Sequence, residues 1–293
     1  MSIEIQSAEV ENNTPHTFTF TKPVKQYMVG FSRCYMKFSK ADHHIKEISI
    51  DLTNSEIKNN QITIQPQLKM NDCSDHKESH TSSITIVVIA TLKNDNSNIF
   101  IHTIIKAEEP TNLPMINVNP TFIKSALSYS YVKYPKSDHH IYSYITEIAP
   151  VVDFNYFVLK GQSILQDQNY HFGNGKVSGG VIFYFGEDQK VLCSDFNSKQ
   201  IQPDENGKTD NTQKICFGEA PKDFNSDNYE IGCFIDKYQL SFQDSTDHHV
   251  KMIEISAMLN ENKLFVENGK IYAKICFKSL LSDGEQHKFD VPH

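Results

Sequence analysis

Hydrophobic and polar residues alternate along most of this chain, which is the period expected of half-buried β-strands. Residues 17–21 alternate strictly, whereas residues 84–90 and 181–185 are short apolar runs typical of strands that are buried on both faces. No long stretch places apolar residues at i, i+3, i+4 and i+7, the spacing of an amphipathic helix. The pattern predicts an all-β protein, in which the glycine-rich residues 173–180 form a hairpin turn.

The tripeptide Asp-His-His occurs three times and marks an internal repeat. Each copy follows a short alternating run of aromatic or apolar residues and precedes a β-branched residue, which is Ile45, Ile141 or Val250. Roughly 100 residues separate successive copies, about the size of a small β domain. The three triplets are Asp42, His43 and His44; Asp138, His139 and His140; and Asp247, His248 and His249.

The repeat predicts two to three diverged antiparallel β-sandwich-like modules in tandem, each marked by an Asp-His-His turn. Residues 1–107 would hold an N-terminal strand and the first module. Residues 108–225 would hold a proline-rich linker, the second module and a hairpin insertion. Residues 226–293 would form a truncated third module. The modules would pack either along the chain or around a shared centre.

The third module is truncated because only residues 288–291 correspond to the last apolar strand of the other two. An alternative alignment, which matches residues 174–177 with residues 268–271, would leave it complete. In the truncated case one sheet edge lies open, and proteins ordinarily cover or pair such an edge. We expect it to be filled by residues 17–21 or by a strand of a partner protein.

The nine triplet residues are predicted to be a structural motif. An Asp between two strands can accept backbone hydrogen bonds and close a turn, here within its own module. Apolar or β-branched residues then follow at i, i+3 and i+5, as in Ile45, Ile48 and Ile50. This change of phase indicates either a β-bulge or that Ile45 and its counterparts face away from the main core. One histidine of each pair would lie partly buried at the entrance to the next strand, with a hydrogen-bond partner.

Histidine and aspartate also bind zinc, iron or manganese, so a metal site is the alternative. Adjacent residues of a strand point to opposite faces, however, and both imidazoles of one triplet cannot easily bind the same ion. Further ligands would have to come from other segments, and the candidates do not recur with the triplet. They are His76, His80, His102 and His171. We therefore expect no metal and no cofactor.

Composition narrows the classes of partner. With 293 residues, 39% of them hydrophobic, the chain can form large cores without a disulfide or a metal. The net charge is −8 and Arg33 is the only arginine, which disfavours nucleic acid. The chain has no long apolar stretch and no secretion signal at its start, so we expect a cytoplasmic protein without a membrane partner. The six cysteines lack paired spacing and are expected to be reduced.

No nucleophile elbow, phosphate-binding loop or His-Glu-x-x-His motif is present, so we expect no enzyme activity. The sequence favours a non-catalytic structural or protein-interaction component, a subunit of a larger assembly that binds copies of itself or other proteins. A lectin-like protein that binds carbohydrate is the alternative, although the chain has no tryptophan to stack on sugar rings. A metal-dependent hydrolase that uses the triplets is a lower alternative.

Overall fold

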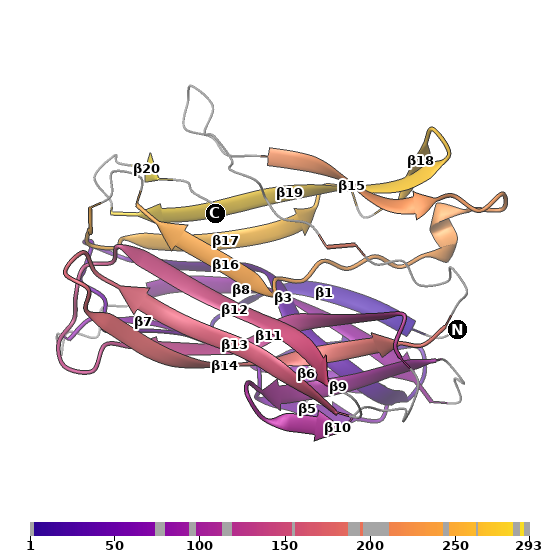
Figure 1. The fold of residues 1–293 in the computed structure, drawn as a ribbon, viewed down its shortest axis with the longest axis horizontal. Helices are drawn as coiled ribbons and strands as arrows, with labels where there is room; N and C mark the ends of the chain where they lie inside the picture. Colours follow the sequence, from indigo (N-terminus) through magenta and orange to yellow (C-terminus); the bar gives the residue numbers. More distant parts are fainter. Residues whose placement is uncertain are drawn as a thin grey trace.

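The computed structural model describes residues 3–73, 80–93, 98–112, 119–153, 156–186, 194–195, 211–242, 246–261, 263–283 and 288–289. These residues are almost entirely β, and the recorded strand pairs are antiparallel. They contain no α-helix, only one 3-10 turn, Ser226–Asn228, and none of their segments is a helix able to cross a membrane. The predicted all-β fold is confirmed, and Figure 1 shows its long strands lying in stacked layers.

An eight-stranded sheet contains strands from both ends of the chain. Its strands follow the order β1-β8-β3-β17-β19-β15, with β18 and β20 also paired to β19. Figure 1 shows β17 and β19 side by side. The bounds are β1 Ile3–Glu11, β3 Val24–Phe38, β8 His80–Leu92, β15 Asn211–Glu219, β17 Met252–Leu259, β18 Phe265–Glu267, β19 Lys270–Ser282 and β20 Lys288–Phe289. Of the predicted hairpin insertion only β15 is described; residues 190–193 and the turn at 203–208 lie outside the described residues.

A nine-stranded sheet contains the middle of the chain. Its order is β16-β12-β13-β14-β11-β4-β7, with β10 paired to β13 and β9 to β14. The bounds are β4 Glu47–Asp51, β7 Gln67–Asn71, β9 Ile99–Lys106, β10 Pro110–Asn112, β11 Phe122–Lys133, β12 Ser143–Asp153, β13 Tyr156–Gln166, β14 Phe172–Tyr184 and β16 Lys237–Ser241. This sheet therefore ends at β16 on one side and at β7 on the other.

A third sheet has three short strands in the order β2-β6-β5, namely β2 His16–Thr19, β6 Gln61–Ile64 and β5 Ser55–Lys58. The strand predicted at residues 17–21 is thus present as β2. It pairs with β6, where Phe18 lies opposite Ile62. The hypothesis that this strand fills the open edge of the third module is wrong, because among the described residues β2 pairs with β6 in the three-stranded sheet and with no strand of residues 226–293.

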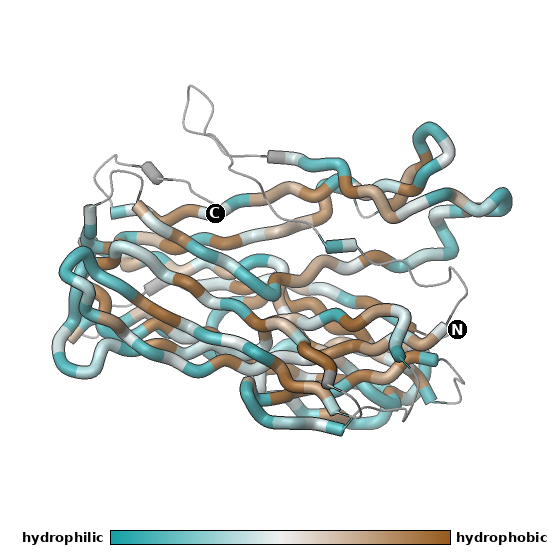
Figure 2. Tube along the Cα trace, viewed as in Figure 1, coloured by the Kyte–Doolittle hydropathy of each residue, from teal (hydrophilic) through white to brown (hydrophobic). Residues whose placement is uncertain are grey.

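Alternation along the strands builds a core between the sheets. Figure 2 shows brown and teal positions following one another along the strands, as half-buried strands require. In β3 the side chains of Cys34, Met36 and Phe38 are buried, and the residues between them are partly exposed. Most buried apolar residues of both large sheets belong to one continuous cluster.

The prediction that the glycine-rich residues 173–180 form a hairpin turn is wrong. These residues are part of the long strand β14. A Cβ on Gly175 would lie 1.8 Å from the carbonyl oxygen of Tyr131 in the neighbouring strand β11. Glycine is needed here because two backbones approach closely, not because the chain reverses. Glycine composition alone does not separate these two roles.

Cysteines in the described residues are free thiols, at positions 34, 73, 216, 233 and 276. Burial raises the pKa of Cys34 to about 12, and it raises the pKa of Cys233 to about 12 as well. Both therefore remain neutral thiols at ordinary pH and pack as small apolar side chains.

Strand pairing between distant parts of the chain brings the three triplets together. The strand that follows one Asp-His-His triplet pairs with the strand that precedes another: β4 with β11, β12 with β16, and β17 with β3. These three pairs close a ring, in which each triplet lies at the end of two of them. The three triplets therefore lie around a shared centre.

Candidate functional site

The three Asp-His-His segments are joined by isolated backbone bridges that continue the ring of strand pairs. His43 pairs with Val250, Ile45 with His139, and Ile141 with His248. Each bridge has two backbone hydrogen bonds; those of His43 and Val250 are 3.0 and 2.8 Å long. Every segment therefore hydrogen-bonds to both of the others through the backbone.

The residue after each triplet is buried completely, as Ile45, Ile141 and Val250 show. The chain bends at the next residue and the following strand starts after that, at Glu47, Ser143 or Met252. The predicted change of phase is present, but this bend between a bridge and a strand produces it. A β-bulge, one of the two predicted causes, is absent from the recorded pairing of these three described strands. The other predicted cause is wrong, because Ile45 and its counterparts belong to the main core.

The first histidine of each triplet binds an aspartate that the sequence analysis did not identify. Nδ1 of His43 lies 2.9 Å from Asp72, Nδ1 of His139 lies 2.9 Å from Asp167, and Nδ1 of His248 lies 3.3 Å from Asp283. The same three imidazoles contact the aromatic residue that precedes the triplet, at centroid distances of 4.7 Å (Phe38), 4.6 Å (Tyr134) and 4.5 Å (Phe242). These histidines are anchored in place by a carboxylate and a ring.

A sequence signal for those aspartates does exist. Each one ends a strand in the order apolar, polar, aspartate: Met70-Asn71-Asp72, Leu165-Gln166-Asp167 and Leu281-Ser282-Asp283. The pattern is short, and its distance from the triplet varies, so it becomes recognisable only once the ring of segments is known.

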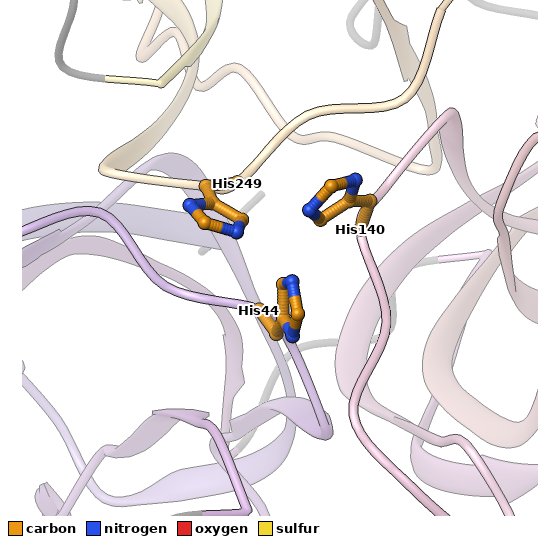
Figure 3. Close-up of side chains that lie close together, drawn as sticks. All are labelled: His44, His140 and His249. Carbon is orange, nitrogen blue, oxygen red and sulfur yellow. The ribbon is translucent and has the colours of Figure 1, made fainter.

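The second histidines, His44, His140 and His249, meet at the centre of the ring (Figure 3). Their ring centroids are 4.5 Å apart in all three pairs, with edge-to-face orientation. One nitrogen of each ring points toward the space between them (Figure 3), and the three rings can offer nitrogens that lie within 4.8 Å of one another. Their side chains are 42%, 37% and 42% exposed, so the centre is open to solvent.

The triplet aspartates surround this centre, and each faces a histidine of another segment. Nδ1 of His140 lies 3.3 Å from Asp247; the corresponding distances are 3.8 Å from His44 to Asp138 and 3.7 Å from His249 to Asp42. Because Nδ1 faces the carboxylate, Nε2 is the nitrogen of each ring that faces the centre, as Figure 3 shows.

The prediction that each triplet aspartate accepts backbone hydrogen bonds within its own module is wrong where these bonds are described. Oδ2 of Asp138 accepts from the backbone N–H of Cys73 at 3.1 Å, and Oδ2 of Asp247 accepts from that of Gln168 at 3.2 Å. Cys73 directly follows Asp72, and Gln168 directly follows Asp167. Each of these two aspartates binds the first histidine of another segment. The aspartates connect segments because the backbone bridges between the triplets place residues of another segment beside each of them.

The pKa of His44 is lowered, first by burial and then by the neighbouring imidazoles of His140 and His249. Both effects disfavour an added proton, since burial removes water from the charged form and the other two rings repel it once charged. A neutral imidazole has a free lone pair, which it can donate to a metal ion.

A second group of possible metal ligands consists of His139, Asp167 and His171, and its atoms already contact one another. Oδ2 of Asp167 lies 2.9 Å from Nδ1 of His139 and 2.6 Å from Nδ1 of His171. Burial of Asp167 would raise its pKa, but hydrogen bonds from His171 outweigh this and lower the pKa. The donor atoms of this group already hydrogen-bond to one another, so it is a closed hydrogen-bond network.

The other candidate ligands do not reach the three-histidine centre. His102 lies against Phe157 and Phe183, where burial lowers its pKa, and His171 belongs to the Asp167 group. His76 and the side chain of His80 lie outside the described residues. Each triplet itself supplies one of three convergent ligands, namely its second histidine.

Three convergent nitrogens with carboxylates behind them can accept a metal ion or a proton. No protein-family model matches the chain, and comparison with curated proteins and with solved structures found no match.

Proposed function

We propose that this protein is a non-catalytic structural or protein-interaction component, built from two complete β modules and one shortened module around the Asp-His-His centre. The first module is β3, β4, β7 and β8, and the second is β11, β12, β13 and β14. The third is β16, β17, β19 and β20. In each module one strand precedes the triplet and the others follow it.

The ring of strand pairs between modules carries this proposal. The first strand of every module pairs with the second strand of another, over five residue pairs in each case. Three separate subunits that form a symmetric trimer can pair their strands in this cyclic way. Here one chain contains all three parts. A unit tied together in this way can present several strand edges in a fixed arrangement.

The third module differs from the others in its last strand. In the first two modules this strand has 13 residues and pairs along most of the module's first strand, as β8 does with β3 and β14 with β11. In the third module β20 is described over two residues only, which pair with β19. The shortened third module is part of this proposal, and its basis is the sequence, in which only residues 288–291 correspond to the last strand of the other two modules.

We propose that such a shortened module leaves strand β16 with an open edge. Among the described residues it pairs with β12 alone and ends the nine-stranded sheet. Its counterparts β3 and β11 each have a neighbour on both sides. Tyr238 and Leu240 of β16 are buried, so the strand is held firmly in place while its outer backbone groups can accept another strand.

The partner that fits this edge is a protein subunit that adds an extended strand by β-augmentation. Its backbone would supply the hydrogen bonds, and its alternate side chains would lie on the two faces of the sheet. The acidic chain, with a net charge of −8, favours a partner whose strand carries lysine or arginine.

Photo-crosslinking in a native extract tests this function. A photoreactive benzoylphenylalanine at position 239, in the middle of β16, is expected to crosslink one discrete partner subunit. The control places it at position 69, an exposed residue of β7, the strand at the other end of the same sheet. Hydrogen exchange of residues 237–241 should also slow in the purified complex, because a paired edge protects its amides.

A crosslink from position 239 to the chain's own C-terminal peptide would show that β16 is closed internally, and it would overturn the docking role. Equal crosslinking of the same proteins from positions 239 and 69 would also contradict it, since contact would then be nonspecific. A discrete partner at position 239 alone would support the proposal.

A further inference from the structure

We infer that His44, His140 and His249 bind one divalent transition-metal ion of the zinc class through their Nε2 atoms. This inference goes beyond the proposed function and does not depend on any partner.

The donor set selects the class of ion. Three imidazole nitrogens converge, and the group contains no thiolate and no carboxylate. Imidazole suits zinc, copper, nickel and iron, whereas magnesium and calcium prefer oxygen ligands. Three protein ligands leave one position of a tetrahedral ion open to water, and the exposure of the rings to solvent provides access for it.

The orientation of the rings resembles that of metal-bound histidines. A histidine ligand ordinarily donates its other N–H to a carboxylate or carbonyl, which holds the tautomer and the ring in place. Here Asp138, Asp247 and Asp42 face Nδ1 of the three rings at 3.8, 3.3 and 3.7 Å. A proton on Nδ1 leaves the Nε2 lone pair free, and Nε2 is the nitrogen that points to the centre (Figure 3).

The spacing of the nitrogens is close to that of a bound site. Zinc–nitrogen bonds of about 2.0–2.1 Å place tetrahedral ligands about 3.3 Å apart. The available nitrogens lie within 4.8 Å of one another, so small rotations of partly exposed rings are enough to bring them into range. The backbone need not move, because the bridges already hold all three segments together.

Each ligand comes from a different segment of the ring, and this has a thermodynamic consequence. An unfolded chain does not hold three imidazoles roughly 100 residues apart in one place, so the ion binds the folded state in preference. Binding must therefore raise the unfolding temperature, by an amount that grows with free metal concentration.

The test uses the full chain, stripped of metal with a chelator and then titrated with Zn²⁺. We expect one equivalent of zinc per chain by calorimetry and elemental analysis, together with an unfolding temperature several degrees higher in zinc. With Co²⁺ in place of zinc, we expect the visible absorption of a four- or five-coordinate nitrogen site rather than that of the aquated ion.

Substitutions identify the ligands. His44→Ala, His140→Ala and His249→Ala should each weaken zinc binding at least about 100-fold. Asp138→Asn should weaken it by about 10–100-fold, the usual effect of a carboxylate behind a metal-bound histidine. The matched control is His171→Ala, which removes an exposed imidazole of the Asp167 group and should leave affinity unchanged.

Thermal unfolding of every variant without metal separates a lost ligand from a lost fold. If a single alanine variant does not fold, the cobalt spectrum of the unaltered chain still decides the coordination. Unchanged zinc affinity in folded His44→Ala protein, a loss of affinity in His171→Ala, or a cobalt spectrum of the aquated ion would each overturn the inference. The docking role of β16 is judged separately by crosslinking, so each proposal can fail without the other.

Discussion

Nε of Arg33 donates a hydrogen bond to Oε1 of Glu254 at 2.9 Å, and this contact joins β3 to β17. Arg33 is the only arginine of the chain, and the side chain of Glu254 is only 7% exposed. Glu254 also lies 2.6 Å from Nζ of Lys278 in β19. One buried carboxylate thus connects β3, β17 and β19, three neighbouring strands of the eight-stranded sheet. Strands β17 and β19 are both far from β3 in sequence.

Replacing Arg33 with methionine is expected to lower the free energy of unfolding by about 1–3 kcal/mol, because a buried carboxylate loses a charged hydrogen-bond donor. The loss is limited because Lys278 remains beside Glu254. Urea denaturation measures the change. Lys263→Met is the control, since Lys263 is largely exposed and forms a weak surface pair with Asp227. Equal destabilisation by both substitutions would contradict the role of Arg33.

Asp138→Ala is expected to lower the free energy of unfolding by about 1–2 kcal/mol, because the backbone N–H of Cys73 loses its acceptor. Asp138→Asn keeps an acceptor oxygen and should cost less. Chemical denaturation of metal-free protein measures both, and Glu56→Ala, at an exposed position of β5, is the control. A stability equal to that of the unaltered chain in Asp138→Ala protein would show that the aspartate holds no structural bond.

Gly175→Ala should destabilise the protein by about 2 kcal/mol or more, since the new methyl group would collide with the backbone of β11. Gly218→Ala is the comparison. A Cβ there meets nothing within 4 Å, but the φ of +116° disfavours any side chain, at a cost of about 1 kcal/mol. Thermal unfolding of both variants should rank Gly175→Ala as the less stable. The reverse order would mean that β11 and β14 can separate at this point.

His102 should make the protein less stable in mild acid. Burial lowers its pKa below the ordinary value of about 6.5. Well above that value neither the folded nor the unfolded state carries the proton, and His102 has no effect. As the pH falls through about 6.5, the unfolded chain binds a proton that the folded chain does not, so unfolding becomes more favourable until the lower folded pKa is passed.

The His102→Phe variant keeps an aromatic ring beside Phe157 and Phe183 and cannot titrate. Its free energy of unfolding should fall less between pH 7 and pH 5 than that of the unaltered chain, and urea denaturation at several pH values measures the difference. Parallel curves for the two proteins would show that His102 takes up its proton equally well in both states.

Much of the fold is visible in local sequence. The all-β class and the strands within residues 17–21, 84–90 and 181–185 follow from period-two patterning and apolar runs. Local patterning does not predict the bend that is found in place of the bulge. It also does not predict the strand that is found in place of the turn at residues 173–180. Both depend on which backbone lies next to them, as the contact of Gly175 with Tyr131 illustrates.

The candidate site shows the same division. The sequence by itself determined which nine residues form the motif and which residues flank it. Only the tertiary structure decided that the first histidines bind Asp72, Asp167 and Asp283, while the second histidines meet one another. The physical reason is that side-chain periodicity is set by the backbone of a single strand, whereas pairs such as β4 with β11 depend on register and core packing between residues far apart in the chain.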